Sequence, residues 1–323
     1  VIYQRSEFYV MRLMKIEKKS IMPLLMGTVV MLAGFNTHAT LGHNFSPDES
    51  ASFLALVNIL KAEAQMVQQN LASNNMSLAS DHANKALALL TDDVNKEIGE
   101  RNQRLSDDLS TALASLKIST ESAQGNKTAG DIDLLVNDIN GILDEIVTAR
   151  IDPDQLNNST IQVLAVAELL DEVLRNYGDA FAVGYDMTNM SMMTMDGHNN
   201  TNNSGENSSI HSISTMNMSD GDDNMSMEDM SNSNDILINT TDFQTAQALA
   251  LKVQELFDIQ IMNSSLSEGS ETADQTINNV SAALEDLVRS IDGKASPMDI
   301  MMIIHTRIHP NLMAAFGLQL ENG

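Results

Sequence analysis

The chain contains no cysteine and no tryptophan, and only 4% of its 323 residues are aromatic. The missing thiols exclude disulfides, thiolate metal sites, iron–sulfur clusters and covalently attached haem. A soft metal ion would have to use the thioether sulfur of methionine. Ala, Leu, Val and Ile supply most of the apolar content, which favours helices packed on helices over an aromatic-rich β-sandwich.

Basic residues are also scarce, because 18 Lys and Arg face 44 Asp and Glu, for a formal net charge of -26. Such an acidic chain repels nucleic acid and anionic membrane surfaces and attracts cations. Common catalytic motifs are missing as well: the sequence has no Gly-rich phosphate loop, no HExxH and no GxSxG. We therefore expect no nucleic-acid partner and no enzymatic activity.

The first 39 residues have the pattern of an export signal. Three lysines precede an apolar run from Ile21 to Phe35, and small residues lie before the peptide bond that follows Ala39. The run is shorter than the roughly 20 residues that span a bilayer. We expect residues 1–39 to be removed, leaving a secreted, periplasmic or cell-surface protein without a transmembrane anchor. Many Asn-X-Ser/Thr triplets are consistent with a glycoprotein in that compartment.

Residues 40–182 are predicted to form an N-terminal helical bundle. Ser46-Pro47-Asp48-Glu49 is a capping box that predicts a helix start. Apolar residues then recur at steps of three and four, which is typical of helices with one buried face. A further cap is expected near Ser106. The five apolar stripes run from Phe53 to Leu71, Ala83 to Ile98, Leu109 to Leu116, Ile132 to Ile146 and Val163 to Phe181.

Residues 236–323 are predicted to form a second helical part. A capping box at Thr241 and a Ser296-Pro297 cap precede apolar helix faces, and Pro310 is expected to break or restart the last helix. The predicted fold class is therefore all-α, with one helical bundle or two small ones and a long insertion.

The two helical parts also align with each other. Asp81–Ile98 aligns without a gap with Asp274–Ile291, and Arg104–Leu113 aligns with Arg307–Phe316. Residues 236–323 would then repeat residues 46–118. Amphipathic helices also resemble one another because they share the same packing demands, so duplication and chance both stay open.

Residues 183–235, between these parts, lack aliphatic periodicity and are too polar to offset the entropy of ordering, which predicts disorder. This stretch holds ten of the 22 methionines. Because Leu, Val and Phe are nearly missing from it, we expect these methionines to be ligands rather than core. The predicted metal ligands are Met187, Met190, Met192, Met193, Met195, His198, His211, Met216, Met218, Met225, Met227 and Met230.

Thioether sulfur is soft and selects Cu(I) over hard cations, while His and carboxylates can hold Cu(II) before reduction. The Met-x-Met and Met-x-x-Met clusters of residues 187–230 resemble the Met/His-rich extracytoplasmic segments of copper-transporter ectodomains and bacterial copper-resistance proteins. The resemblance implies copper capture, buffering or delivery, and it does not extend to the helices. The alternative is a structural or protein-interaction component of the cell envelope with a glycosylated flexible linker.

Histidines outside this stretch are further candidate ligands. His305 and His309 are four residues apart and share a helical face that could hold a metal, although Pro310 favours a capping role for His309. His82 is expected to be solvated or to cap a helix. His43 lies close to the predicted mature amino terminus, where it could join a copper site.

Overall fold

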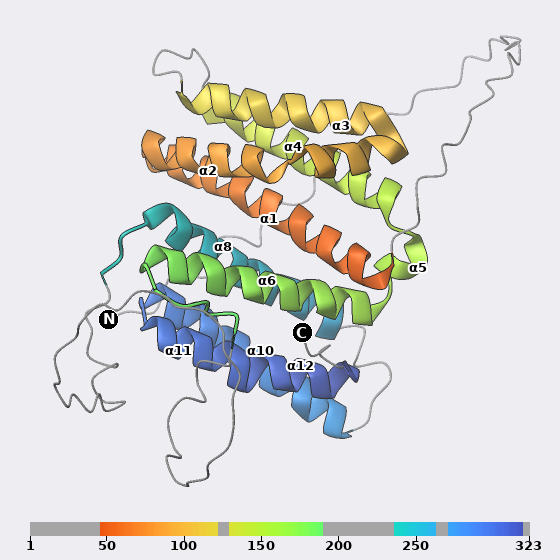
Figure 1. Ribbon diagram of the computed structural model, residues 1–323, viewed down its shortest axis with the longest axis vertical. Helices are drawn as coiled ribbons and strands as arrows, with labels where there is room; N and C mark the ends of the chain where they lie inside the picture. The colour runs from red at the N-terminus through yellow and green to blue at the C-terminus, as the bar shows by residue number, and fades with distance from the viewer. Residues whose placement is uncertain (1–45, 122–128, 190–235, 263–270, 319–323) are drawn as a thin grey trace, which may run out of the picture. The chain divides into compact units, whose positions relative to one another are not determined.

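The computed structural model describes residues 46–121, 129–189, 236–262 and 271–318 (Figure 1). This part of the chain is 86% helical and has no strands, which confirms the predicted all-α fold class. The described residues belong to one compact unit. None of their helices is long and apolar enough to cross a membrane.

A first group of helices follows the predicted capping box. The Ser46 side chain accepts the Glu49 amide at 3.3 Å, and the Glu49 carboxylate accepts the Ser46 amide at 2.6 Å, so the box is confirmed. The buried faces of this group share one core, which includes Leu60, Leu113 and Ile139. The group consists of α1 (Pro47–Ala72), α2 (Met76–Leu89), α3 (Asp92–Glu121) and α4 (Ala129–Arg150).

Two boundaries in this group differ from the prediction. The second predicted helix is divided between α2 and α3, because the Thr91 hydroxyl accepts the Val94 amide at 3.3 Å and begins a new helix. The new helix predicted near Ser106 begins earlier, because α3 consists of two helical parts that meet at the non-helical Asn102 (φ -156°, ψ 97°). The Ser106 hydroxyl instead donates to the Asn95 carbonyl at 3.0 Å, across the kink.

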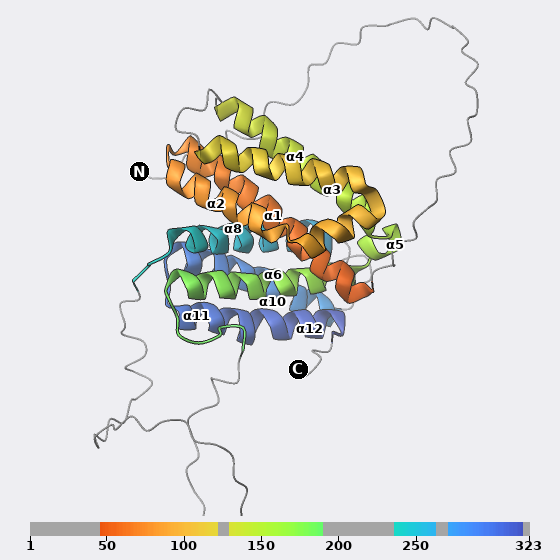
Figure 2. The same ribbon diagram turned by 45° about the horizontal axis from the view of Figure 1, so that its top comes forward.

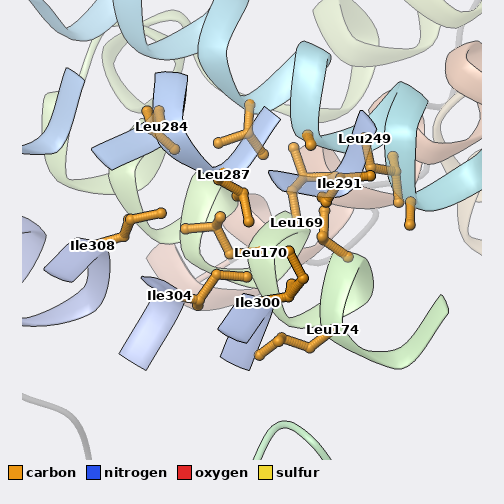
Figure 3. Close-up of a cluster of buried hydrophobic side chains, with 14 of the residues drawn as sticks. Leu169, Leu170, Leu174, Leu249, Leu284, Leu287, Ile291, Ile300, Ile304 and Ile308 are labelled. Carbon is orange, nitrogen blue, oxygen red and sulfur yellow. The ribbon is translucent and has the colours of Figure 1, made fainter. Parts of the chain in front are cut away.

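A second group of helices packs around another core. Figure 3 shows leucine and isoleucine side chains from α6, α8, α10, α11 and η3 converging there, among them Leu170, Leu249, Leu287 and Ile304. The π-helical turns are η2 (Phe257–Met262) and η3 (Ile303–Ile308). The α-helices are α6 (Ser159–Ala180), α8 (Thr240–Leu256), α10 (Glu271–Asp292), α11 (Pro297–Met302) and α12 (His309–Phe316), with the short α5 (Pro153–Leu156) before α6.

Two further predictions concern helix ends. The cap of α8 is Asn239, whose side-chain oxygen accepts the amides of Thr241 and Asp242 at 3.1 and 3.2 Å, so no capping box begins at Thr241. The prediction that Pro310 breaks or restarts the last helix is confirmed as a restart, because α12 begins at His309 directly after η3. Pro310 lies in the first turn of α12, where a missing amide hydrogen is tolerated.

Helices α1 and α6 join the two groups (Figure 2). Most buried residues of α1 face the first core, but Ala62 and Met66 contribute to the second. Conversely, α6 lies mainly in the second core, with Ile161 and Ala165 in the first. The helix that ends the predicted bundle of residues 40–182 therefore packs mostly against helices that follow residue 236.

The segments of the suggested duplication differ in helix breaks. Asp81–Ile98 includes the end of α2 and the start of α3, whereas Asp274–Ile291 lies within the uninterrupted α10. Arg104–Leu113 lies inside α3, whereas Arg307–Phe316 passes from η3 into α12. A common origin of the two parts stays a prediction.

Candidate metal site at the base of the methionine-rich segment

Only one of the predicted copper ligands, Met187, lies in the part of the chain that the structure describes. Of the stretch predicted to be disordered, residues 190–235 lie outside the described residues. Residues 183–189 are described and pack against the second core, so the prediction is wrong for them. We use the name methionine-rich segment for residues 190–230. The predicted ligands outside the described residues are Met190, Met192, Met193, Met195, His198, His211, Met216, Met218, Met225, Met227 and Met230.

Met187 is a core residue, with 3% of its surface exposed. After α6 the chain turns back at Ala182, which has a φ of 51°, and the Val183 amide donates to the Gly178 carbonyl at 2.9 Å. A methyl group on Gly178 would lie 3.0 Å from the Met187 sulfur, so this glycine leaves room for the thioether. The prediction that these methionines avoid the core is thus wrong for Met187, because a turn after α6 folds it back onto the helix.

The chain returns to the same end of α6 on the far side of the segment. The amides of Ile238 and Asn239 both donate to the Ala180 carbonyl, at 2.9 and 3.1 Å. Ala180 is the last residue of α6, and its carbonyl has no partner further along the helix. Both ends of the stretch from 190 to 235 are therefore attached to one helix terminus.

Two histidines lie next to the outgoing end. His305 of η3 is 7% exposed, and its Nε2 donates to the Met187 carbonyl at 2.9 Å. The ring of His309 stands at 74° to that of His305, with 5.3 Å between the ring centres. The shared face predicted for this pair is confirmed. His309 does not cap a helix, because η3 continues directly into α12.

The environment of His309 disfavours its charged form. Burial, with a smaller contribution from the neighbouring His305, lowers the pKa of His309 to about 4. Its Nε2 is buried and has no hydrogen-bond partner within the described part of the chain. The ring is therefore neutral at physiological pH, which is the form that binds metals.

Asp171 of α6 interacts electrostatically with His305. Burial raises the pKa of Asp171, while Arg175 and His305 act in the opposite direction. Asp186, before Met187, has a lowered pKa because the Thr188 hydroxyl and amide donate to its carboxylate at 2.7 and 2.9 Å. Of these two carboxylates, only that of Asp171 interacts with the histidine pair, through His305.

A second polar site, which the sequence did not predict, lies between the two helix groups. Glu63 of α1 and His82 of α2 are both 0% exposed, and His82 Nδ1 donates to Glu63 at 2.7 Å. The expectation that His82 is solvated or caps a helix is therefore wrong. Its Nε2 lies 2.9 Å from Gln244 Oε1 on α8, and Thr245 donates to Glu63 at 2.8 Å.

Lys85 and Asn70 make further hydrogen bonds in this network. Lys85 donates to Asp242 at 2.6 Å and to Thr245 at 3.2 Å, and Asn70 donates to Gln244 at 2.8 Å. Each ring nitrogen and carboxylate oxygen at the centre has a partner, which is the mark of a structural network. A glutamate and a histidine at positions flanked by core alanines, such as Ala64 and Ala83, were the available sequence signal.

Neither site forms a larger acid–imidazole cluster. Within the described ranges, no three His, Asp or Glu side chains gather closely enough to hold a metal ion. Comparisons with protein-family models, curated proteins and solved structures gave no match for this chain.

Proposed function

We propose that this protein is a non-enzymatic, extracytoplasmic copper-binding protein that captures, buffers or delivers copper. The observation that carries the proposal is the density of soft ligands in the methionine-rich segment, which has nine methionines and two histidines between residues 190 and 230. Thioethers prefer Cu(I), and His with carboxylates supports Cu(II). Met187 is left out of the ligand set because it is buried in the core.

The attachment of the segment supports this function. The outgoing flank bonds the Gly178 carbonyl through Val183, and the returning flank bonds the Ala180 carbonyl through Ile238 and Asn239, so both flanks are attached to the end of α6. Confinement raises the effective concentration of one sulfur near another, which favours several thioethers on one ion. The helical groups act as the scaffold that holds the segment.

The proposed location depends on the export signal at residues 1–39 and cleavage after Ala39. Outside the cytoplasm the protein would meet copper ions directly, and its acidic chain, with a net charge of -26, would attract cations. Mass spectrometry of the protein purified from its host would find Thr40 as the amino terminus. A mature chain that retains residues 15–39 would contradict export by cleavage.

The test of copper binding is a Cu(I) titration against a chromophoric competitor. The full chain is compared with a variant in which the nine methionines of the segment are replaced by leucine, a change that conserves size and removes sulfur. We expect this variant to lose most of its Cu(I) capacity. The matched control replaces three helical methionines with leucine and should bind Cu(I) as the parent does. These methionines are Met76, Met298 and Met302.

Equal Cu(I) affinity in the parent and the nine-leucine variant would reject the proposal. A second variant tests the alternative of an envelope interaction protein. It replaces residues 190–235 with a short Gly-Ser linker, because both flanks are attached to the end of α6. If the proposal holds, the deletion should remove most of the Cu(I) capacity. Unchanged localisation and partner binding, with no copper effect, would favour the envelope role.

A further inference from the structure

The rings of His305 and His309 meet at the base of the methionine-rich segment with two ring nitrogens available. The Met187 carbonyl accepts the Nε2 proton of His305, which in the neutral ring leaves Nδ1 to accept a bond. A backbone carbonyl that orients an imidazole in this way is the usual outer partner of a metal-binding histidine.

His309 provides the second nitrogen. Its Nε2 is buried without a hydrogen-bond partner among the described residues. Such an atom costs free energy unless something binds it, and native proteins keep few of them. In contrast, both ring nitrogens of the buried His82 have an oxygen partner. The chain therefore gives a buried histidine a complete set of partners where the histidine has only a structural role.

The spacing of the rings suits a single metal ion. Metal–nitrogen bonds of about 2.0–2.1 Å place two imidazoles of one tetrahedral ion with ring centres about 5 Å apart. The centres of His305 and His309 are 5.3 Å apart, and the 74° between the planes prevents stacking. Imidazole is a good ligand for copper and zinc.

We propose that His305 and His309 form a binding site for one copper ion at the base of the methionine-rich segment. The choice of copper rests on the proposed function, whereas the pairing of the two rings does not. The two imidazoles supply two ligands and solvent supplies the others. An ion at this site would connect the scaffold, through Met187, with the chain that enters the segment.

The test starts from a full chain whose segment has no ligands left. Its nine methionines are replaced by leucine, and His198 and His211 by glutamine. Titration with Cu(I) should then give one equivalent bound, with affinity at least about tenfold lower after His309→Phe. Phenylalanine keeps a ring and removes the nitrogens. Met76→Leu, at an exposed position of α2, is the control and should leave the affinity unchanged.

Thermal unfolding is a second measurement, which distinguishes the loss of a metal ligand from damage to the helical scaffold. Without metal, His309→Phe should unfold at the same or a higher temperature than its parent, because a buried nitrogen without a partner is removed. Cu(I) should raise the unfolding temperature of the parent and leave that of His309→Phe unchanged. If His309→Phe folds poorly, the parent with both histidines intact is measured instead. The ring ¹⁵N chemical shifts of His305 and His309 should then change when Cu(I) is added.

The outcomes separate this site from the segment. No difference between His309→Phe and its parent, or no ring ¹⁵N shift, would overturn the site. Binding of Zn(II) but not Cu(I) at His309 would overturn the assignment to copper. If the nine-leucine change has no effect on Cu(I) binding while His309→Phe does, the segment hypothesis fails and the histidine site stands.

Discussion

Around His82, between α1, α2 and α8, each ring nitrogen has an oxygen partner, whereas around His309 a buried ring nitrogen has none among the described residues. Both regions remove an imidazole nitrogen from solvent, although His82 is fully buried and His309 only partly so. This difference indicates where a functional site should be sought. A complete hydrogen-bond network stabilises a fold, whereas a buried nitrogen without a partner needs another explanation. Three predictions test this contrast.

The largest effect is expected from Glu63→Ala. The change leaves His82 and Thr245 buried without their acceptor, so the free energy of unfolding should fall by about 3–5 kcal/mol. Urea unfolding measures it. The matched control is Glu255→Ala, which removes an exposed ion pair with Lys252 and should cost less than about 1 kcal/mol. Similar losses in both variants would remove the distinction between the regions.

A smaller effect is expected from the protonation of His309. Its folded pKa of about 4 lies below the unfolded value of 6.5, so below pH 6.5 the unfolded state takes up a proton that the folded state refuses. Stability therefore falls as the pH drops. Between pH 7 and 5 the parent should lose about 2 kcal/mol more than His309→Phe. Parallel pH profiles of unfolding would show that His309 is not buried in its neutral form.

The smallest effect concerns the packing of Met187 at the base of the segment. Gly141→Ala, in α4 with no atom within 4 Å of the new methyl group, should stabilise the protein by about 0.5–1 kcal/mol. Gly178→Ala, in α6, should lack this gain because the methyl group meets the Met187 sulfur at 3.0 Å. Adding Met187→Ala should restore the gain from the alanine at 178 in a double-mutant cycle. Equal gains at both glycines would show that Met187 does not pack there.

Local rules predicted much of the fold. The Ser46 box and the Ser296 cap hold as expected, because each depends on residues three positions apart in the chain. Apolar spacing identified the buried faces of α1 and α6 for the same reason. Local rules placed two helix starts a few residues too late, at the Asn102 kink and at the Asn239 cap.

The candidate sites depend on contacts between distant parts of the chain. His82 is satisfied by residues 19 and 162 positions away, so no local pattern could show its burial. Met187 is buried because Gly178 leaves space and His305 binds its carbonyl, 118 positions away. The spacing of His305 and His309 was visible in the sequence, but the missing partner of His309 was not.

X-ray absorption at the copper edge of the Cu(I)-loaded full chain tests the central claim of thioether binding most directly. We predict that sulfur neighbours dominate the copper environment in the parent, and that only nitrogen or oxygen neighbours remain in the nine-leucine variant. A copper environment without sulfur in the parent would contradict the account.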